Sequence, residues 1–118
     1  MRSRFLVVVV AMSLSGALGQ GIAGASPIPS YSISCAVGGN TTADWQRARV
    51  DQVDFEWFAP AGSSGVFETV TVPVTSKGRH GSAFTTTLLS STGVAPAGVT
   101  VTFTHADGTA DHVEATCT

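Results

Sequence analysis

The sequence of 118 residues predicts an all-β fold: a single small antiparallel β-sandwich of six to seven strands, with one disulfide between the first and last strands. Short segments in which apolar and polar residues alternate are separated by runs rich in glycine, proline and serine. Two cysteines lie near the two ends of the region that carries this alternation. Inward apolar faces with outward threonines fit two packed sheets better than a barrel.

The first element along the chain is a leader, residues 1–25. Its basic start (Arg2, Arg4) is followed by an apolar run and by the small residues Ala-Gly-Ala at 23–25. This order is typical of a secretory signal peptide, so we expect a secreted, extracellular protein whose domain spans residues 26–118. Retention of the apolar run as a membrane anchor is the alternative, although the run is shorter than the ~20 residues that span a bilayer.

The net charge of residues 26–118 argues against some classes of partner. Four basic side chains stand against eight acidic ones, a net charge of −4 with neutral histidines. A domain of this kind has no basic field to attract phosphate backbones or anionic lipids, so we expect no nucleic-acid partner and no membrane partner after leader cleavage. Its length is that of one domain, which we expect to be a monomer. The Ala-, Gly-, Val- and Thr-rich composition is typical of bacterial proteins.

Five segments that alternate strictly are expected to be strands. They are residues 31–37, 53–57, 70–74, 84–88 and 99–103. Pro73 cannot donate a hydrogen bond to a neighbouring strand, so we expect its strand at a sheet edge or at a bulge. Residues 41–53 hold too few apolar positions for a helix that packs on a core. We expect a loop there, with or without one helical turn, that leads into a strand.

Cys35 and Cys117 are expected to form a disulfide, because an exported protein with two cysteines most often joins them. The closed loop would take in nearly the whole domain, and the chain-entropy relation gives roughly 4 kcal/mol of stabilisation for such a loop. A reactive or metal-binding thiol pair is the weaker alternative, because neither cysteine lies in a CxxC motif or beside basic residues at a helix start.

An immunoglobulin-like topology, or a related Greek key, is the commonest arrangement for a sandwich of this size. The order cysteine, tryptophan, cysteine along the chain invites this comparison. In immunoglobulin domains, however, the cysteines join the second and sixth strands, whereas here they would join the first and last.

Residues 103–117 hold two histidines, two aspartates and a cysteine, which raises the question of a metal or catalytic site. A two-residue loop would turn apolar side chains of the second strand outward. A three-residue loop at residues 106–108, with Gly108 at positive φ, instead pairs Val101 with Val113 and keeps the apolar side chains on one face. Burial selects the second register, so we predict a β-hairpin.

In this register His112 faces solvent opposite Thr102, whereas His105 shares the inward face of the hairpin. The two imidazoles therefore cannot bind one ion. Asp107 and Asp111 could supply oxygen ligands to a calcium ion, but the segment lacks the dense spacing of acidic residues that calcium loops use. We therefore expect no metal, no cofactor and no catalytic residue, and hence a protein that is not an enzyme.

Two functions from different classes remain. The first is a small secreted binding module that contacts an extracellular protein or glycan through its loops or strand edges. The second is an inhibitor of secreted hydrolases of the protease type, acting through the loop 75–82. In that case Lys77 or Arg79 would enter an acidic specificity pocket, but the glycines of this loop reduce the rigidity that an inhibitor needs.

The candidate interaction residues are Trp45, Arg47, Arg49, Lys77 and Arg79, which include every basic residue of the domain. Trp45 lies outside any clear apolar alternation and beside two arginines, a combination that is common at interface hot spots. Alternatively, Trp45 covers one end of the core, with the arginine stems packed on its ring.

Overall fold

The computed structural model describes residues 8–9, 28–75 and 78–118. These residues form strands, turns and loops, and they contain no helix that is long and apolar enough to cross a membrane. The cleavage position predicted after residue 25 and the side chain of Lys77 lie outside the described residues.

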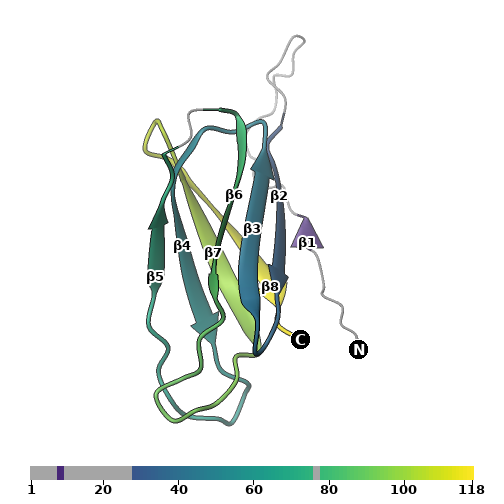
Figure 1. Ribbon diagram of the computed structural model, residues 1–118, viewed down its shortest axis with the longest axis vertical. Coiled ribbons are helices and arrows are strands. Elements are labelled where there is room, and N and C mark those ends of the chain that lie inside the picture. Colours follow the sequence, from purple (N-terminus) through teal and green to yellow (C-terminus); the bar gives the residue numbers. More distant parts are fainter. Residues whose placement is uncertain (1–7, 10–27, 76–77) are drawn as a thin grey trace.

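Two antiparallel sheets face each other (Figure 1), with the strand orders β1-β2-β3-β6 and β5-β4-β7-β8. The strands are β1 (Val8–Val9), β2 (Ser30–Cys35), β3 (Asn40–Gln46), β4 (Val50–Phe58), β5 (Val70–Pro73), β6 (His80–Thr86), β7 (Gly98–His105) and β8 (Ala110–Thr116). β1 belongs to the predicted leader and pairs with the outer edge of β2. The other seven strands confirm the predicted all-β sandwich.

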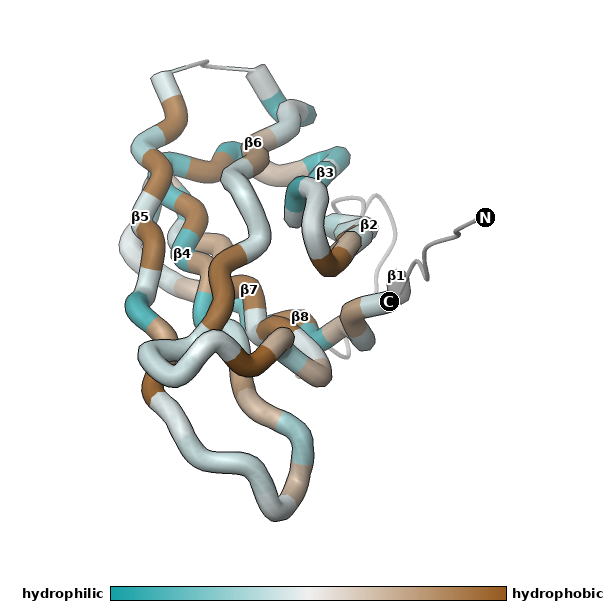
Figure 2. Tube along the Cα trace, turned by 60° about the horizontal axis from the view of Figure 1, so that its bottom comes forward, coloured by the Kyte–Doolittle hydropathy of each residue, from teal (hydrophilic) through white to brown (hydrophobic). Residues whose placement is uncertain are grey.

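The core lies between the sheets and is built from alternate residues of the strands. Figure 2 shows apolar and polar positions alternating along β4 and β5. Ile33 of β2, Phe55 of β4 and Phe103 of β7 are fully buried. Burying each of these side chains contributes about 1.5–3 kcal/mol, so the two sheets are held together mainly by these contacts.

The prediction of a loop at residues 41–53 is wrong, because Asn40–Gln46 form a complete strand, β3. Its inward positions include Thr41 and Ala43, both of which are fully buried. The Thr41 hydroxyl accepts a hydrogen bond from Nε1 of Trp57 at 3.1 Å. Since a hydrogen-bonded threonine and an alanine occupy inward positions, the alternation of this strand is not visible as an apolar pattern.

Pro73 ends β5, which is the outermost strand of its sheet, so the predicted edge position is confirmed. The partner strand β4 has an irregularity between Val50 and Gln52 at its own start. Because a proline cannot donate to a further strand, this edge is closed to continued pairing at that point.

The predicted disulfide between Cys35 and Cys117 is present. Around it, the amide of Thr118 donates to the Cys35 carbonyl at 3.0 Å, and the amide of Val37 donates to the Thr118 carbonyl at 2.8 Å. The end of the second sheet is thereby joined to the edge of β2 in the first sheet. At this point one covalent bond and two backbone hydrogen bonds join the chain after β8 to the end of β2.

The predicted register of the last hairpin is also confirmed. Val101 pairs with Val113, and Thr102 pairs with His112 on the outer face. Gly108 has a φ of 93°, as the three-residue loop requires. The alternation of the apolar residues alone was sufficient to select this register.

Candidate binding site at the cationic end

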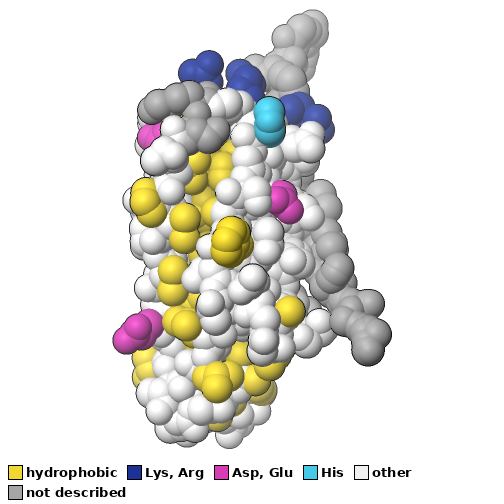
Figure 3. All heavy atoms as spheres, in the orientation of Figure 1, with side chains coloured by type: hydrophobic (Ala, Val, Ile, Leu, Met, Phe, Trp, Pro, Cys, Tyr) yellow, Lys and Arg dark blue, Asp and Glu magenta, His cyan; other side chains and the backbone are white. Residues whose placement is uncertain are grey.

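Every arginine in residues 28–75 and 78–118 lies at one end of the sandwich (Figure 3). Arg47 and Arg49 lie in the connection from β3 to β4, and Arg79 directly precedes β6. Arg79 is far from Arg47 and Arg49 in the sequence. It lies near them because β3 pairs with β6, with Gln46 opposite His80. We call Arg47, Arg49 and Arg79 the cationic end.

The backbone of this end is tied together across three connections. The amide of Ala48 donates to the Arg79 carbonyl at 3.0 Å, and the amide of Ala106 donates to the Arg49 carbonyl at 3.0 Å. Ala48 is buried, and Arg47 adopts a φ of 62°, which is uncommon for a residue other than glycine. The backbone positions of the three arginines are therefore fixed by hydrogen bonds and packing.

None of these arginines forms an ion pair with an acidic side chain among the described residues, although Asp107 and Asp111 line the same hollow as Arg49 and Arg79. In the part of the chain that the structure describes, the one ion pair joins His105 and Asp111, at 3.0 Å. The guanidinium of Arg47 donates from Nε to the backbone carbonyl of Ile28 at 3.1 Å, which leaves its charge unpaired. Arginine stays protonated at any ordinary pH, so the cationic end keeps its positive charge.

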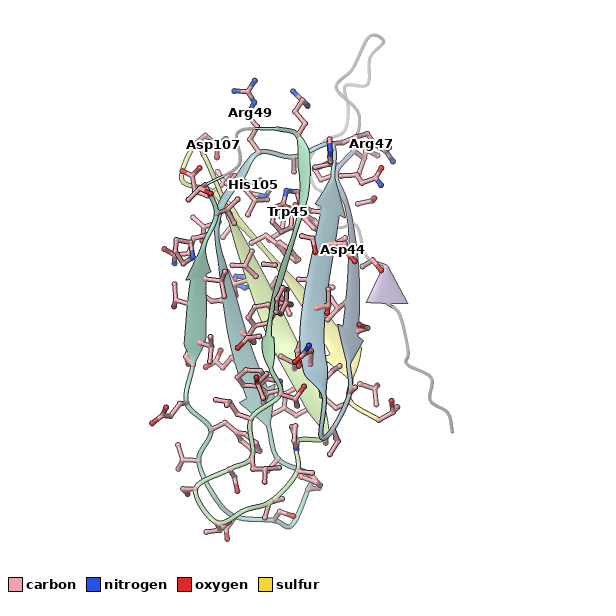
Figure 4. All side chains as sticks on the ribbon, in the orientation of Figure 1. Asp44, Trp45, Arg47, Arg49, His105 and Asp107 are labelled. Atoms are coloured by element: carbon pink, nitrogen blue, oxygen red, sulfur yellow. A yellow bond between two sulfur atoms is a disulfide. The ribbon has the colours of Figure 1, made fainter. Side chains whose placement is uncertain are left out.

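Two open hollows lie at this end, and Arg79 lines both of them. The first is lined by Arg49, Arg79, His105, Asp111 and the turn from β7 to β8. The second is lined by Arg47, Arg79 and His80. Figure 4 shows Arg47 and Arg49 projecting from this end, with His105 below Arg49. Each hollow thus presents two guanidiniums to solvent.

A hydrogen-bonded network lies beneath the first hollow. The Tyr31 hydroxyl donates to Oδ2 of Asp111 at 2.5 Å, and Nε2 of His105 lies 3.0 Å from both of these oxygens. The Tyr31 ring stacks on Phe103, with a centroid distance of 4.3 Å. Burial, together with the hydrogen bond to Asp111, raises the pKa of Tyr31 far above its ordinary value. The network connects β2 of one sheet to β7 and β8 of the other.

The two aspartates of the hairpin have structural partners. The carboxylate of Asp107 accepts hydrogen bonds from the hydroxyl of Thr109 at 2.7 Å and from its amide at 2.9 Å, and these bonds lower the pKa of Asp107. Asp111 is engaged by Tyr31, as described above. Among the described residues, no group of three or more histidine, cysteine, aspartate and glutamate side chains is placed to hold a metal ion.

Trp45 lies in the core and is only 2% exposed. Its ring meets Phe103 edge-on at a centroid distance of 6.0 Å. Gly81 of the neighbouring strand lies against the ring, so closely that a Cβ on Gly81 would approach Cζ2 of Trp45 to 2.5 Å. Of the two alternatives for Trp45, this placement matches the residue that covers the end of the core. The ring is not available as a surface anchor.

The loop predicted at residues 75–82 is shorter in the structure, because β6 begins at His80. Arg79 is the last residue before that strand, and Lys77 lies outside the described residues. Among the described residues, the basic side chains at this end are those of Arg47, Arg49 and Arg79.

Two features of this end were not identified from the sequence, namely His80 as a lining residue and the network of Tyr31 with Asp111. The hairpin register already placed Asp111 on the inward face, together with Val113. The missing information was the contact with Tyr31, which is 80 residues away in the sequence.

Three comparisons, with protein-family models, with curated proteins and with solved structures, found no match to this chain. The function is therefore inferred from the residues and their arrangement.

Proposed function

We propose that the protein is a small secreted, non-enzymatic binding module that contacts an extracellular partner through its cationic end. The observation that carries this proposal is the convergence of Arg47, Arg49 and Arg79, none of which has an acidic partner among the described residues. The predicted domain as a whole is acidic, with a net charge of −4, so the local positive charge contrasts with its surroundings. Such a contrast orients an acidic partner during encounter.

The scaffold supports this role. The disulfide is compatible with an extracellular location, where such bonds persist. Connections that are hydrogen-bonded to each other present the arginines with little loss of conformational entropy on binding. Loops on a rigid sandwich commonly carry recognition in small domains.

The strand order supports an immunoglobulin-like Greek key for this scaffold. β2, β3 and β6 face β4, β7 and β8, which corresponds to the first, second and fifth strands opposite the third, sixth and seventh. β5 pairs with β4 instead of joining the sheet of β2 and β3. Domains of this type use the loops at either end of the sandwich for contacts.

The alternative is an inhibitor of secreted proteases that acts through residues 75–82. The Arg79 carbonyl accepts a hydrogen bond from Ala48, and residues from His80 onward are paired in β6. This pairing leaves little free chain on the C-terminal side of Arg79 for insertion into a protease cleft. We rank inhibition second, and stoichiometric inhibition of a trypsin-like protease without cleavage at Arg79 would reverse the ranking.

The binding proposal is tested by recovering partners from the native extracellular medium with wild-type protein and with the triple variant Arg47→Gln, Arg49→Gln and Arg79→Gln. We expect a partner that the wild type retains and the triple variant loses, although both unfold at the same temperature. Equal retention by the two proteins would show that binding does not use the cationic end, and the proposal would be rejected.

A further inference from the structure

We infer that the cationic end recognises carboxylates on an acidic protein segment, and that Arg79 is its central contact. This inference rests on the proposed function and adds the class of partner and the way it is held. The residues concerned are the three arginines and the two side chains that flank them, His80 and Asp107.

The central place of Arg79 follows from the two hollows. Arg79 lines one hollow together with Arg49 and the other together with Arg47. The planar guanidinium presents parallel N–H donors that match the two oxygens of a carboxylate. Each hollow can therefore hold one carboxylate between two guanidiniums. A segment with two acidic side chains a few residues apart would fill both hollows, and Arg79 would contribute to each.

The charges around the first hollow favour a protein segment over a uniformly anionic polymer. Two carboxylates border this hollow, Asp107 and Asp111, and Asp111 is held by Tyr31 and His105. Asp107 is exposed, and hydrogen bonds from Thr109 lower its pKa, so it stays ionised. An anionic polysaccharide would place some of its charges against Asp107 and against the acidic body of the domain. A protein segment can place a neutral or basic residue there instead.

The burial of the aromatic residues at this end also favours a protein segment over a glycan as the partner. Sugar rings commonly pack their apolar faces on exposed aromatic side chains, but Tyr31 and Trp45 are both buried in the core. A glycan would therefore have to bind through charge and hydrogen bonds, without stacking on either of these rings. Carboxylates of a protein segment need only the guanidinium pairs that the two hollows provide.

The test measures fluorescence anisotropy of labelled peptides with the whole secreted protein at low and at physiological ionic strength. One peptide alternates glutamate with serine, and its control carries glutamine in place of each glutamate. Heparin and polygalacturonate, as competitors, represent anionic glycans. We expect the glutamate peptide to bind, the glutamine peptide not to bind, and neither glycan to displace the bound peptide at the same concentration of negative charges.

The protein variants separate a local contact from an effect of net charge. Arg79→Gln should weaken peptide binding by about tenfold or more, and Arg47→Gln or Arg49→Gln by less, since each of these lines one hollow only. Arg79→Lys should give an intermediate loss, because it keeps the charge but not the parallel donors. Ser63→Glu, in the loop from β4 to β5 at the opposite end, changes the net charge by the same amount as Arg79→Gln and should leave the affinity unchanged.

Equal losses for Arg79→Gln and Ser63→Glu would overturn the central role of Arg79. Tighter binding of a glycan than of the glutamate peptide, with dependence on Arg79, would overturn the choice of partner but leave the proposed function intact. Failure of both the peptide and the glycans to bind at low ionic strength would overturn both. Thermal unfolding of each variant confirms that the fold is retained.

Discussion

The two ends of the sandwich differ in both charge and construction. At the cationic end, connections between strands are short and carry three arginines. At the opposite end, the connections from β4 to β5 and from β6 to β7 are longer, and they carry one charged residue, Glu68, close to the start of β5. The remaining loop stretches, residues 59–67 and 87–97, contain no charged residue. The longer loops also expose apolar side chains, of which Val66 is 73% exposed. We call these two stretches the uncharged end.

The hydrogen bonds of the uncharged end centre on one buried side chain, Ser90. Its hydroxyl accepts hydrogen bonds from the amides of Thr92 at 3.2 Å and Val94 at 3.0 Å. The neighbouring Ser91 donates its amide to the carbonyl of Val66, which joins the two loops. Gly65 lies so close to Ser90 that a Cβ on it would approach the hydroxyl to 2.6 Å.

The loops at the two ends are held in place by different interactions. The uncharged end uses a buried hydroxyl to order loops that have few partners of their own. The cationic end is ordered by the strands and by backbone hydrogen bonds between connections, so its guanidinium charges are not used in ion pairs that order this end. We expect substitutions at the uncharged end to change stability alone, and substitutions of the arginines to change binding alone.

The largest expected effect comes from Trp45→Ala, beneath the cationic end. Truncating a buried aromatic side chain typically costs about 3–5 kcal/mol of unfolding free energy, measured here by chemical denaturation. Gly81→Ala provides a second probe of the same contact, and overpacking against the ring should cost about 1–3 kcal/mol. A Trp45→Ala variant with wild-type stability and no binding would mean that Trp45 acts as a surface anchor.

Ser90→Ala is expected to have a smaller effect, confined to the uncharged end. The substitution leaves the amides of Thr92 and Val94 without their acceptor, which should lower the unfolding free energy by about 1–3 kcal/mol. Ser63→Ala in the neighbouring loop serves as the control and should be close to neutral. Peptide binding at the cationic end should be the same for both variants. A loss of binding in Ser90→Ala would contradict the independence of the two ends.

The smallest effect at neutral pH, but the most specific, concerns Tyr31. Its pKa is raised in the folded protein above the usual value of about 10, so the neutral hydroxyl stabilises the fold fully below that pH. As pH rises above about 10, this stabilisation should be lost progressively. Tyr31 is the only tyrosine of the chain, so tyrosinate absorbance reports its ionisation directly.

Tyr31→Phe separates this contribution from other alkaline titrations. The variant should be less stable near neutral pH, because Asp111 and His105 lose their hydroxyl partner. The fall in its stability above pH 10 should be shallower than that of the wild type. Appearance of tyrosinate near pH 10 in the folded wild type, before unfolding, would contradict a raised pKa.

The fold could be predicted where local alternation determines the pairing, as in the hairpin of Val101 and Val113. The fold could not be predicted for β3, because its buried Thr41 forms hydrogen bonds with Trp57 and Thr87, which are distant in the sequence. A polar side chain gives the same local signal whether it faces solvent or a partner in the core. The inward role of Thr41 therefore depends on residues that the local sequence does not contain.

The candidate site was predicted only in part, for a related reason. The basic stretches around Arg47 and Arg79 were identified, but their convergence depends on the pairing of β3 with β6. The same holds for Tyr31, whose partner Asp111 lies on the other sheet. Composition identifies charged residues, whereas their placement at one end is a property of the strand order.

The closure at Cys35 has a practical consequence for attaching the protein to a surface. Thr118 follows the disulfide and is held beside β2. Figure 1 shows the C-terminus on the lower part of the molecule, and Figure 3 shows, in the same orientation, the arginine side chains at the top. A biotin or sensor-chip linker joined after Thr118 would leave the sandwich at a point anchored by the disulfide. Every immobilised molecule would then present the cationic end outward, so that partners could be screened without chemical coupling through lysine.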